Sequence, residues 1–335
     1  MTKEKISIIG AGSWGTTLAI VLSRKGVEVE LHSVFREHNL NMLKDRQNRL
    51  FLKGAKFPPS LKINPSLKDT LKNEIIVIAI PVKFVRSVLK KIKKQKLKLK
   101  DKIFVSVSKG IEAKSLKRVS QLIEDELGVL KLAVLSGPNI STEVLRGVPS
   151  TSVLACKSKT VGRRLQLLFT NPTFRVYLHN DITGVELGGA LKNIIALSCG
   201  ISDGLGFGTN TKSGLVTRGL AEITRLGKKL GAKPSVFWGI SGLGDLVTTC
   251  FSPYSRNRSL GEQIGKGKKL KDVLSKMKMV AEGVETVKST YKLSKKLKVE
   301  MPITQEVYAV LYKDKSPKKA VTDLMTRPLK AEKVT

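Results

Sequence analysis

The chain is short of cysteine and histidine, and both shortages narrow the chemistry open to it. Its 335 residues include three cysteines, Cys156, Cys199 and Cys250, which are odd in number and widely spaced. They fit neither a disulfide framework nor a zinc cluster, so we expect reduced thiols in a cytoplasmic protein and no metal site. Three histidines leave few candidates for a histidine-based catalyst.

Acidic residues are also scarce: 27 Asp and Glu stand against 61 Lys and Arg, a net charge of +34. Such a balance can indicate binding to nucleic acid or an anionic membrane. The lysines are spread along the chain, however, and are not interleaved with the aromatic residues, which make up 5% of it. In the densest run, residues 82–102, Val85, Val88, Leu89 and Ile92 keep a helical spacing that leaves the cations on a solvated face. We therefore expect no specific nucleic-acid partner, at most weak peripheral membrane contact, and a field that attracts phosphorylated small molecules.

Long apolar runs are missing as well. No continuous run approaches the roughly 18 residues of a membrane span, and the start, MTKEKISIIGAG, has no signal-peptide pattern. A hydrophobic content of 41% with 26% charged residues is typical of a globular protein with a real core. At this length two domains are expected.

The order of apolar runs predicts one α/β half and one helical half. Residues 5–9 and 27–31 read as strands that flank a helical segment, which is a β-α-β unit. Later strand-like runs predict a parallel sheet with crossovers and further strands at its far edge; they cover residues 74–81, 102–108, 132–138, 150–157 and 174–179. Beyond residue 181 the pattern is helical throughout. We therefore predict a Rossmann-type α/β domain over residues 1–180 and an all-helical substrate and catalytic domain over 181–335.

A glycine motif opens the first helix. Gly10, Gly12 and Gly15 form GxGxxG with Ser13 and Trp14, directly after a strand. The three glycines suit a tight turn, close backbone approach to a pyrophosphate, and close helix–strand packing, and the helix N-terminus attracts the anion. An ordinary glycine turn is the alternative, but this context favours a dinucleotide.

The end of the second strand indicates whether the chain prefers NAD or NADP. NAD sites usually carry an acidic residue there, whereas this strand ends in His32 and Ser33, with Arg36 close behind and Glu30 one or two places early. The missing acid and the nearby arginine favour a 2′-phosphate, so we expect NAD(P)H with a preference for NADPH.

The helical half contains motifs that identify a family. GGALKN places Lys192 in an apolar run, either as a snorkelling side chain or as a desolvated amine kept for proton transfer. Together with GAGSWGT, SKG, SGPN, GLGDL, SRNR, VAEGVET, MPITQEVY and RPLKAE, it resembles bacterial NAD(P)-dependent glycerol-3-phosphate dehydrogenase from about residue 5 to 332. The resemblance implies hydride transfer between sn-glycerol 3-phosphate and dihydroxyacetone phosphate. It also implies a supply of glycerol 3-phosphate for phospholipid synthesis.

The resemblance assigns roles by position. Lys192 becomes the general acid/base, Lys109 helps polarise the reacting oxygen, and Asp245 orients Lys192. The implied substrate-binding residues are Lys109, Gly137, Asn139, Lys192, Asn193, Asp245, Thr249, Ser255, Arg256 and Asn257. With the glycine motif, the cofactor-binding set is Gly10, Gly12, Ser13, Trp14, Gly15, Arg36, Lys109, Ser141, Arg256, Val280 and Glu282.

For three of these residues a purely structural role remains an alternative to the functional one. Asp245 and Glu282 could each cap a helix, and Arg256 could belong to a plain surface turn. Two stretches also depart from the family pattern. SGPN is followed by Ile140 and Ser141 where many members have an alanine-rich stretch, and HSVFREH does not align cleanly. The second departure bears on the role of Arg36.

Two other classes of protein compete with this interpretation. 6-Phosphogluconate and β-hydroxyacid dehydrogenases also use a lysine on an early helix of the second domain, but the GLGDL and SRNR pair argues against them. A nucleotide sensor or nucleic-acid-binding protein would exploit the charge but leaves Lys109, Lys192 and Asp245 unexplained. Family members are commonly dimers, so a homodimer is expected from the resemblance alone.

Overall fold

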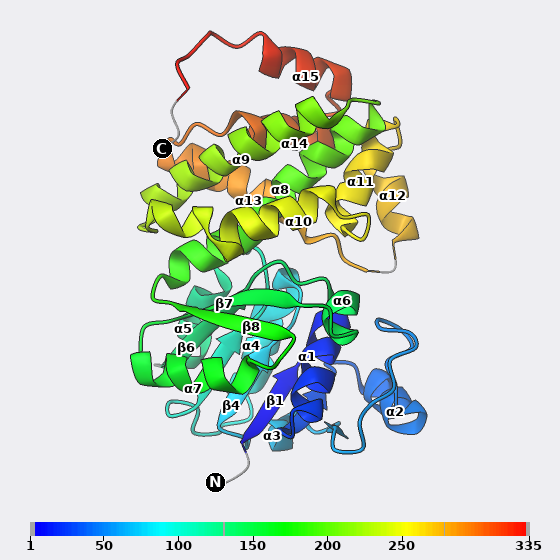
Figure 1. Cartoon of the computed structure of the whole chain (residues 1–335), viewed down its shortest axis with the longest axis vertical. Helices are drawn as coiled ribbons and strands as arrows, with labels where there is room; N and C mark the ends of the chain where they lie inside the picture. The colour runs from blue at the N-terminus through cyan, green and yellow to red at the C-terminus, as the bar shows by residue number, and fades with distance from the viewer. Residues whose placement is uncertain (1–3, 130, 278, 333–335) are drawn as a thin grey trace. The chain divides into compact units, whose positions relative to one another are not determined.

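The computed structural model describes residues 4–129, 131–277 and 279–332, which fold into two compact units (Figure 1). The first unit comprises Met1–Ser108 and Val119–Ile182, and the second comprises Lys109–Arg118 and Thr183–Thr335. The expected division at residue 180 lies two residues before the end of the first unit. It misses the Lys109–Arg118 segment, which belongs to the second unit although it lies within the first half of the sequence.

The first unit is built on one eight-stranded sheet in the order β3-β2-β1-β4-β5-β6-β7-β8. The strands are β1 (Lys5–Ile9), β2 (Glu28–His32), β3 (Lys62–Ile63), β4 (Ile75–Ile78), β5 (Ile103–Ser106), β6 (Lys131–Ser136), β7 (Ser150–Cys156) and β8 (Phe174–His179). All neighbours pair in parallel except β6 and β7, where Leu135 faces Leu154 in an antiparallel register. The order confirms the Rossmann-type sheet. Strand periodicity does not encode strand direction, so the antiparallel pairing of β7 with β6 could not be predicted from the sequence.

Helices cover both faces of this sheet. They are α1 (Ser13–Arg24), α2 (Arg36–Asp45), α3 (Leu67–Thr70), α4 (Val82–Lys93), α5 (Val119–Leu127), α6 (Ser141–Leu145) and α7 (Lys159–Phe169). One apolar core joins the sheet to α1 and α7, and a second joins it to α4 and α5. On α4, Val85, Val88, Leu89 and Ile92 are buried while Lys90 and its neighbouring lysines are exposed. The densest lysine run of the chain is therefore a solvated helix face, as its spacing predicts.

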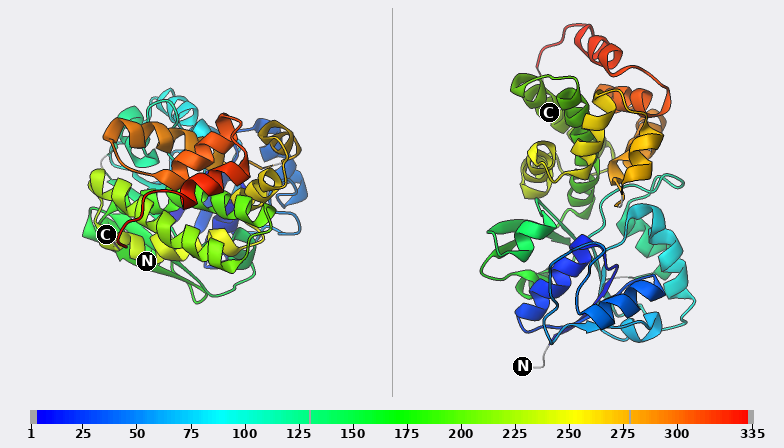
Figure 2. Two further views of the ribbon diagram at one scale, coloured as in Figure 1. Left: turned by 90° about the horizontal axis from the view of Figure 1, so that it is seen from above. Right: turned by 90° about the vertical axis from the view of Figure 1, so that its right-hand side faces the viewer.

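Apart from the Lys109–Arg118 segment, the described secondary structure of the second unit is helical (Figure 2). It contains α8 (Ile182–Gly204), α9 (Thr209–Lys229), the 3-10 turn η1 (Pro234–Trp238), the π turn η2 (Ile240–Gly244), α10 (Asp245–Phe251), α11 (Arg256–Gly265), α12 (Leu270–Lys276), α13 (Glu282–Leu297), α14 (Pro302–Tyr312) and α15 (Pro317–Met325). Within the region predicted to be helical, residues 234–244 form the η1–η2 pair and not one α-helix. Gly239 interrupts it with an extended backbone, at φ −85° and ψ −169°.

Helix α8 forms the core of this unit. By length and composition it could cross a membrane, with a mean hydropathy of 1.2 over 18 residues, but that whole window is buried in the fold, as in the core helix of a globular unit. Glycines let α11 approach it closely. A Cβ atom added at Gly200 would lie 2.0 Å from the Arg258 carbonyl oxygen, and one added at Gly261 would lie 2.2 Å from that of Leu197. The contact fixes the start of α11, where three predicted site residues lie, against α8.

Candidate active site

Lys192 lies in the second unit as a buried amine with three polar neighbours. Its Nζ forms an ion pair with Oδ1 of Asp245 and donates to Oγ1 of Thr249 at 2.6 Å. Lys109 Nζ lies 2.7 Å from the other carboxylate oxygen of Asp245. One carboxylate, 1% exposed, thus sits between two ammonium groups. The structure therefore brings together Lys109, Lys192, Asp245 and Thr249 from separate parts of the sequence.

A glycine in the GGALKN motif makes this cluster possible. A Cβ atom added at Gly188 would lie 2.5 Å from the carbonyl oxygen of Ser241 in η2. Gly242 approaches the Phe237 carbonyl in the same way, with an added Cβ 2.1 Å from that oxygen. A side chain at Gly188 would push η2 and α10 away from α8, and one at Gly242 would push η2 away from η1. Because both are glycines, Asp245 at the start of α10 reaches Lys192.

The environment of Lys192 changes its acidity. Burial lowers the pKa of the amine from 10.5 to about 8; Asp245 opposes this shift, and the like charge of Lys109 adds to it. At pH 7.5 a pKa of about 8 leaves roughly a quarter of the amines neutral, against about 0.1% at the ordinary value. The snorkelling alternative is wrong, since Lys192 is 7% exposed and ends on a buried carboxylate. The amine is suited to exchange a proton near neutral pH.

The helix-cap alternatives for Asp245 and Glu282 find no support in the cap geometry. Helix α10 begins at Asp245 with Gly244 as its N-cap, and α13 begins at Glu282 with Ala281 as its N-cap; neither cap residue makes a side-chain cap hydrogen bond. The Asp245 carboxylate faces lysines instead. Burial raises the pKa of Glu282 to about 7, although Arg256, Lys109 and Lys192 act to lower it. Glu282 therefore lies within the electrostatic reach of the lysine cluster.

The start of α11 carries Ser255, Arg256 and Asn257. The Ser255 hydroxyl caps α11 by accepting from Arg258 N at 3.2 Å. Buried Asn257 accepts from Gly283 N at 3.0 Å, and the exposed Arg256 donates to the Val280 carbonyl at 2.9 Å. These bonds bring Val280 and Glu282 beside the SRNR motif. One guanidinium nitrogen of Arg256 is thus held by the backbone just before α13.

Asn193 lies on the same helix as Lys192 and is 4% exposed. A Cβ atom added at Gly283 would lie 3.0 Å from the Asn193 carbonyl and 2.7 Å from Oδ1 of Asn257. The beginning of α13 is thereby packed onto α8 next to Lys192. Predicted site residues of the second unit, from Lys109 to Glu282, thus occupy connected positions within one unit.

The glycine loop of the first unit has the geometry that a dinucleotide needs. Gly10 has φ +116° and donates to the His32 carbonyl at 2.8 Å, so it makes the tight turn. A Cβ atom at Gly15 would lie 2.0 Å from the Gly10 carbonyl, while one at Gly12 would meet nothing within 4 Å. The open space at Gly12 and the uncapped first turn of α1, with Ser13 and Trp14, fit a pyrophosphate. These residues fit the cofactor.

The end of β2 explains the absence of a ribose-binding acid. Glu30 is tied to Asn64, whose Nδ2 donates to Oε2 at 2.8 Å, and His32 is buried with Nδ1 2.8 Å from the Asn64 carbonyl. Ser33 N donates to Asn39 at 2.7 Å. Arg36 is the first residue of α2 and is exposed. Ser33 and Arg36 therefore follow β2, while Glu30, the acidic residue nearest its end, is engaged by Asn64.

Gly137, Asn139 and Ser141 follow β6 in the first unit. A Cβ atom at Gly137 would lie 2.9 Å from the Ser152 Cα atom, so this glycine lets the chain pass close to β7. Asn139 donates to the Thr151 carbonyl at 2.9 Å and accepts from Ser152 at 3.1 Å. Ser141 opens α6, and its carbonyl accepts from the Thr17 hydroxyl at 3.3 Å. Asn139 of the SGPN motif is thus anchored to β7.

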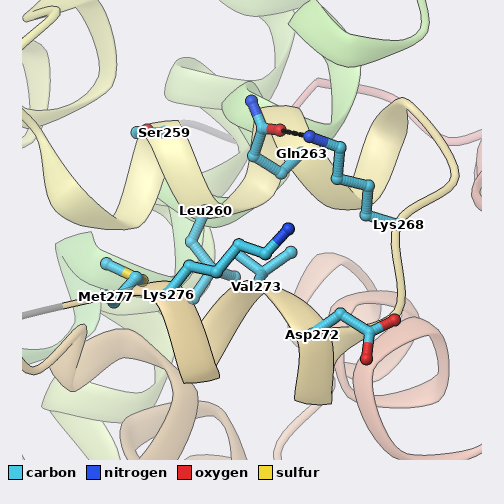
Figure 3. A pocket seen from close by; sticks show the side chains of 8 residues that line it. All are labelled: Ser259, Leu260, Gln263, Lys268, Asp272, Val273, Lys276 and Met277. Carbon is cyan, nitrogen blue, oxygen red and sulfur yellow. Dashed lines mark hydrogen bonds between the residues drawn. The ribbon is translucent and has the colours of Figure 1, made fainter.

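Sequence reasoning missed one ion pair beside the site, between Arg118 and Glu186. The acidic residue stands in the apolar run just before GGALKN, which is the signal that could have revealed it. A separate hollow of about 240 Å³ between α11 and α12 contains none of the predicted site residues (Figure 3). Its lining consists of Ser259, Leu260, Gln263, Lys268, Asp272, Val273, Lys276 and Met277.

Comparison with known proteins places this geometry in a family. Residues 5–162 match the family described as NAD-dependent glycerol-3-phosphate dehydrogenase N-terminus, and residues 181–322 match its C-terminus. Over 335 residues the chain is 49% identical to a glycerol-3-phosphate dehydrogenase (NAD(P)+) of Citrifermentans bemidjiense, covering 99% of each chain. It is 47% identical to that of a Thermoanaerobacter species, covering 98% of each.

A solved structure gives the same result at the level of the fold. The 2.1 Å crystal structure of glycerol-3-phosphate dehydrogenase from Coxiella burnetii is similar with a TM-score of 0.93 and 36% identity. The similarity covers 97% of this chain and 99% of that one. Both halves of the chain are therefore accounted for by one family. The chain belongs to the NAD-dependent glycerol-3-phosphate dehydrogenase family.

Proposed function

We propose that this protein interconverts dihydroxyacetone phosphate and sn-glycerol 3-phosphate with NAD(P)H. The observation that carries the proposal is the buried Lys109–Asp245–Lys192 cluster, in a chain of this family. When bound, the nicotinamide supplies or accepts the hydride. The protein must move the hydroxyl proton, because a secondary alcohol loses hydride readily only as its proton leaves.

Lys192 is the group that moves this proton. As a neutral amine it takes the hydroxyl proton of glycerol 3-phosphate, and as an ammonium it returns a proton to the oxygen of dihydroxyacetone phosphate. Thr249 and Asp245 hold the Lys192 amine from two sides and so fix its direction. Lys109 adds a second positive charge next to Lys192, and this charge stabilises the developing alkoxide.

The substrate phosphate is assigned to the start of α11. An exposed arginine suits a bidentate grip on phosphate oxygens, and the Val280 contact holds Arg256 in place for it. Asn257 and the Ser255 hydroxyl lie on the same turn, and Asn193 lines the reacting end. Gly137, Asn139 and Thr249 complete the proposed substrate set.

The cofactor is assigned to the glycine loop of the first unit, with Gly10, Gly12, Ser13, Trp14 and Gly15. Arg36 favours NADPH, because a guanidinium pairs with a 2′-phosphate. Lys109, Ser141, Arg256, Val280 and Glu282 complete the proposed cofactor set. Among the described residues no group of three His, Cys, Asp or Glu side chains is placed to hold a metal ion.

In the cell we propose a cytoplasmic homodimer that supplies glycerol 3-phosphate for phospholipid synthesis. Peripheral contact with acidic lipid is at most weak, because the positive charge is spread over solvated helix faces such as that of α4. No specific nucleic-acid partner is proposed.

The test is oxidation of NADPH and of NADH by the purified protein with dihydroxyacetone phosphate, followed by absorbance of the reduced nicotinamide. We expect turnover with both cofactors and faster turnover with NADPH. 6-Phosphogluconate with the oxidised cofactors serves as the control and should give none. Absence of turnover with dihydroxyacetone phosphate and either cofactor would overturn the proposal.

A further inference from the structure

A second buried ion pair lies next to the lysine cluster, and no step of the proposed reaction uses it. Arg118 Nη1 donates to the carboxylate of Glu186 on α8. The two side chains are 17% and 5% exposed. A buried ion pair adds little net stability compared with apolar packing, because desolvation offsets the attraction, but it does hold one geometry. This pair therefore calls for an explanation other than stability.

Arg118 ends a segment that is closed on itself. Ile111 and Arg118 form an antiparallel bridge, and Glu112 N donates to the Lys117 carbonyl at 3.0 Å. Leu116 N donates to the Glu112 carbonyl at 2.9 Å. Lys109–Arg118 is thus a small hairpin, entered through Gly110 at φ +148°, a conformation that favours glycine.

The hairpin is attached to the second unit at both of its ends. Lys109 at the first end pairs with Asp245, and Arg118 at the last end pairs with Glu186. Glu186 and Lys192 lie six residues apart on α8, which is about 9 Å along the axis at 1.5 Å per residue. One rigid helix therefore carries both the reacting lysine and the anchor of the segment that carries the other lysine.

We propose that Glu186 is a positioning residue that, through Arg118, holds the Lys109–Arg118 hairpin so that Lys109 stays on Asp245 beside Lys192. The proposal rests on the function proposed above. Neither side chain of the Arg118–Glu186 pair touches the reacting atoms in this scheme. They affect the reaction by fixing the position of the Lys109 ammonium group.

Displacement of Lys109 has a definite electrostatic consequence. Lys109 acts to lower the pKa of Lys192, so its removal raises that pKa. The other ionisable groups near Lys192 are Asp245 on α10, Glu282 on α13 and the buried Cys250 thiol on α10. None of these belongs to the hairpin. A loosened hairpin therefore changes the titration of Lys192 in one direction.

The test variant is Glu186→Gln, which keeps the shape and removes the charge. In glycerol 3-phosphate oxidation we expect kcat to fall roughly 10- to 100-fold, because a small misplacement near the chemistry is enough. The KM of the cofactor should change less than about twofold. The acid limb of kcat/KM should move to higher pH, as it also should in Lys109→Met. Glu306→Gln is the matched control, since it removes a partly buried pair with Lys315 in the same unit; its kcat and pH profile should equal those of the wild type.

A second readout does not depend on turnover. Competitive acetylation of lysines across pH, read by mass spectrometry, gives the titration of Lys192 and the reactivity of Lys109. In Glu186→Gln we expect Lys192 to titrate at higher pH and Lys109 to label faster. Failure of the wild type to turn over dihydroxyacetone phosphate would overturn the proposed function, while the labelling would still decide the positioning role.

Glu186→Gln could instead leave kcat, the acid limb and the lysine labelling unchanged and lower only the melting temperature. That result would show that the ion pair is purely structural and would overturn the proposal. Should that variant fail to fold, Arg118→Lys keeps the positive charge without the guanidinium fork. It should show a smaller shift of the limb in the same direction, and wild-type values there would also overturn the proposal. The Arg118→Met/Glu186→Gln double variant should lose no more activity than either single variant, because both act through one contact.

Discussion

Lys192 donates to the Thr249 hydroxyl at 2.6 Å, and that hydroxyl in turn donates to the backbone carbonyl of Asp245 at 2.7 Å. The hydroxyl hydrogen is thereby committed to the backbone, which leaves the oxygen to accept from the amine. The amine is held by the helix that also carries its charge partner. This arrangement fixes the direction of the amine before substrate binds.

Replacement of Lys192 should therefore remove the chemistry and spare cofactor binding. We expect Lys192→Met to lower kcat by at least about 100-fold, within the range of general acid–base catalysis. Dinucleotide affinity, measured by fluorescence titration, should stay within about twofold. Lys229→Met, at an exposed lysine of α9, is the control and should keep wild-type turnover. Near-normal kcat in Lys192→Met would refute the assignment of Lys192 as the base.

The two partners of the cluster should move the pH profile in opposite directions. With the pKa of Lys192 at about 8, the acid limb of kcat/KM for alcohol oxidation should lie near pH 8. Asp245 raises that pKa and Lys109 lowers it. The limb should therefore move to lower pH in Asp245→Asn and to higher pH in Lys109→Met. Profiles that shift in the same direction in both variants would contradict this electrostatic account.

Most residues of the candidate site can be predicted from the sequence, but the contacts between them cannot. The family resemblance carried by GGALKN, GLGDL and SRNR predicts Lys192, Asp245 and Arg256 as site residues. Nothing in the spacing shows that one carboxylate divides its two oxygens between Lys192 and Lys109. That division depends on the close packing of η2 on Gly188, a contact between backbones that residue patterns do not encode.

The crossing of α8 and α11 should be sensitive to a single methyl group. We expect Gly261→Ala to lower the free energy of unfolding by about 1–3 kcal/mol, because its Cβ would meet the Leu197 carbonyl in a packed interior. Gly214→Ala in α9 is the matched control, since nothing lies within 4 Å of the added Cβ. It should raise stability by about 0.5–1 kcal/mol. Urea unfolding of the three proteins measures both values, and equal stability of the two variants would disprove the close approach.

Glu222 should give the fold a pH dependence of known sign. This buried carboxyl accepts from Ile303 N at 2.5 Å and from Thr304 N at 3.2 Å, and burial raises its pKa to about 7. A raised folded-state pKa contributes stability that is present at low pH and is lost as pH rises from about 4.5 to 7. At 1.36 kcal/mol per unit, this amounts to about 3 kcal/mol.

The variant that reports this effect is Glu222→Gln. Relative to the wild type its free energy of unfolding should improve as pH rises from 5 to about 8, because glutamine does not titrate. Unfolding of both proteins over that range measures the difference. A difference that stays constant with pH would show that Glu222 does not titrate in this range.

Arg36 should control the choice between the two cofactors. We expect Arg36→Ala to raise the KM of NADPH roughly 10- to 100-fold, the loss of one charged hydrogen bond of about 1.5–3 kcal/mol. The KM of NADH should change less than about twofold. Parallel kinetics with both cofactors check this, and an equal change in both would place Arg36 away from the 2′-phosphate.

The fold, too, could be predicted only in part from the residue patterns. Apolar periodicity gave the β-α-β start and the helical second half, because buried faces impose their period on the sequence. The two-residue strand β3 is too short to leave such a signal, and the antiparallel direction of β7 leaves no trace in the alternation of its residues. The η1–η2 turn departs from the expected helix because Gly239 takes an extended backbone.

The Lys109–Arg118 hairpin also determines which segments must be exchanged together in chimeras between members of this family. A chimera cut at residue 182 would take Asp245 and Glu186 from one parent and Lys109 and Arg118 from the other. Two ion pairs would then join residues of different ancestry. The interchangeable module is a helical half together with ten residues from inside the other half, and engineered hybrids within this family need to carry both pieces together.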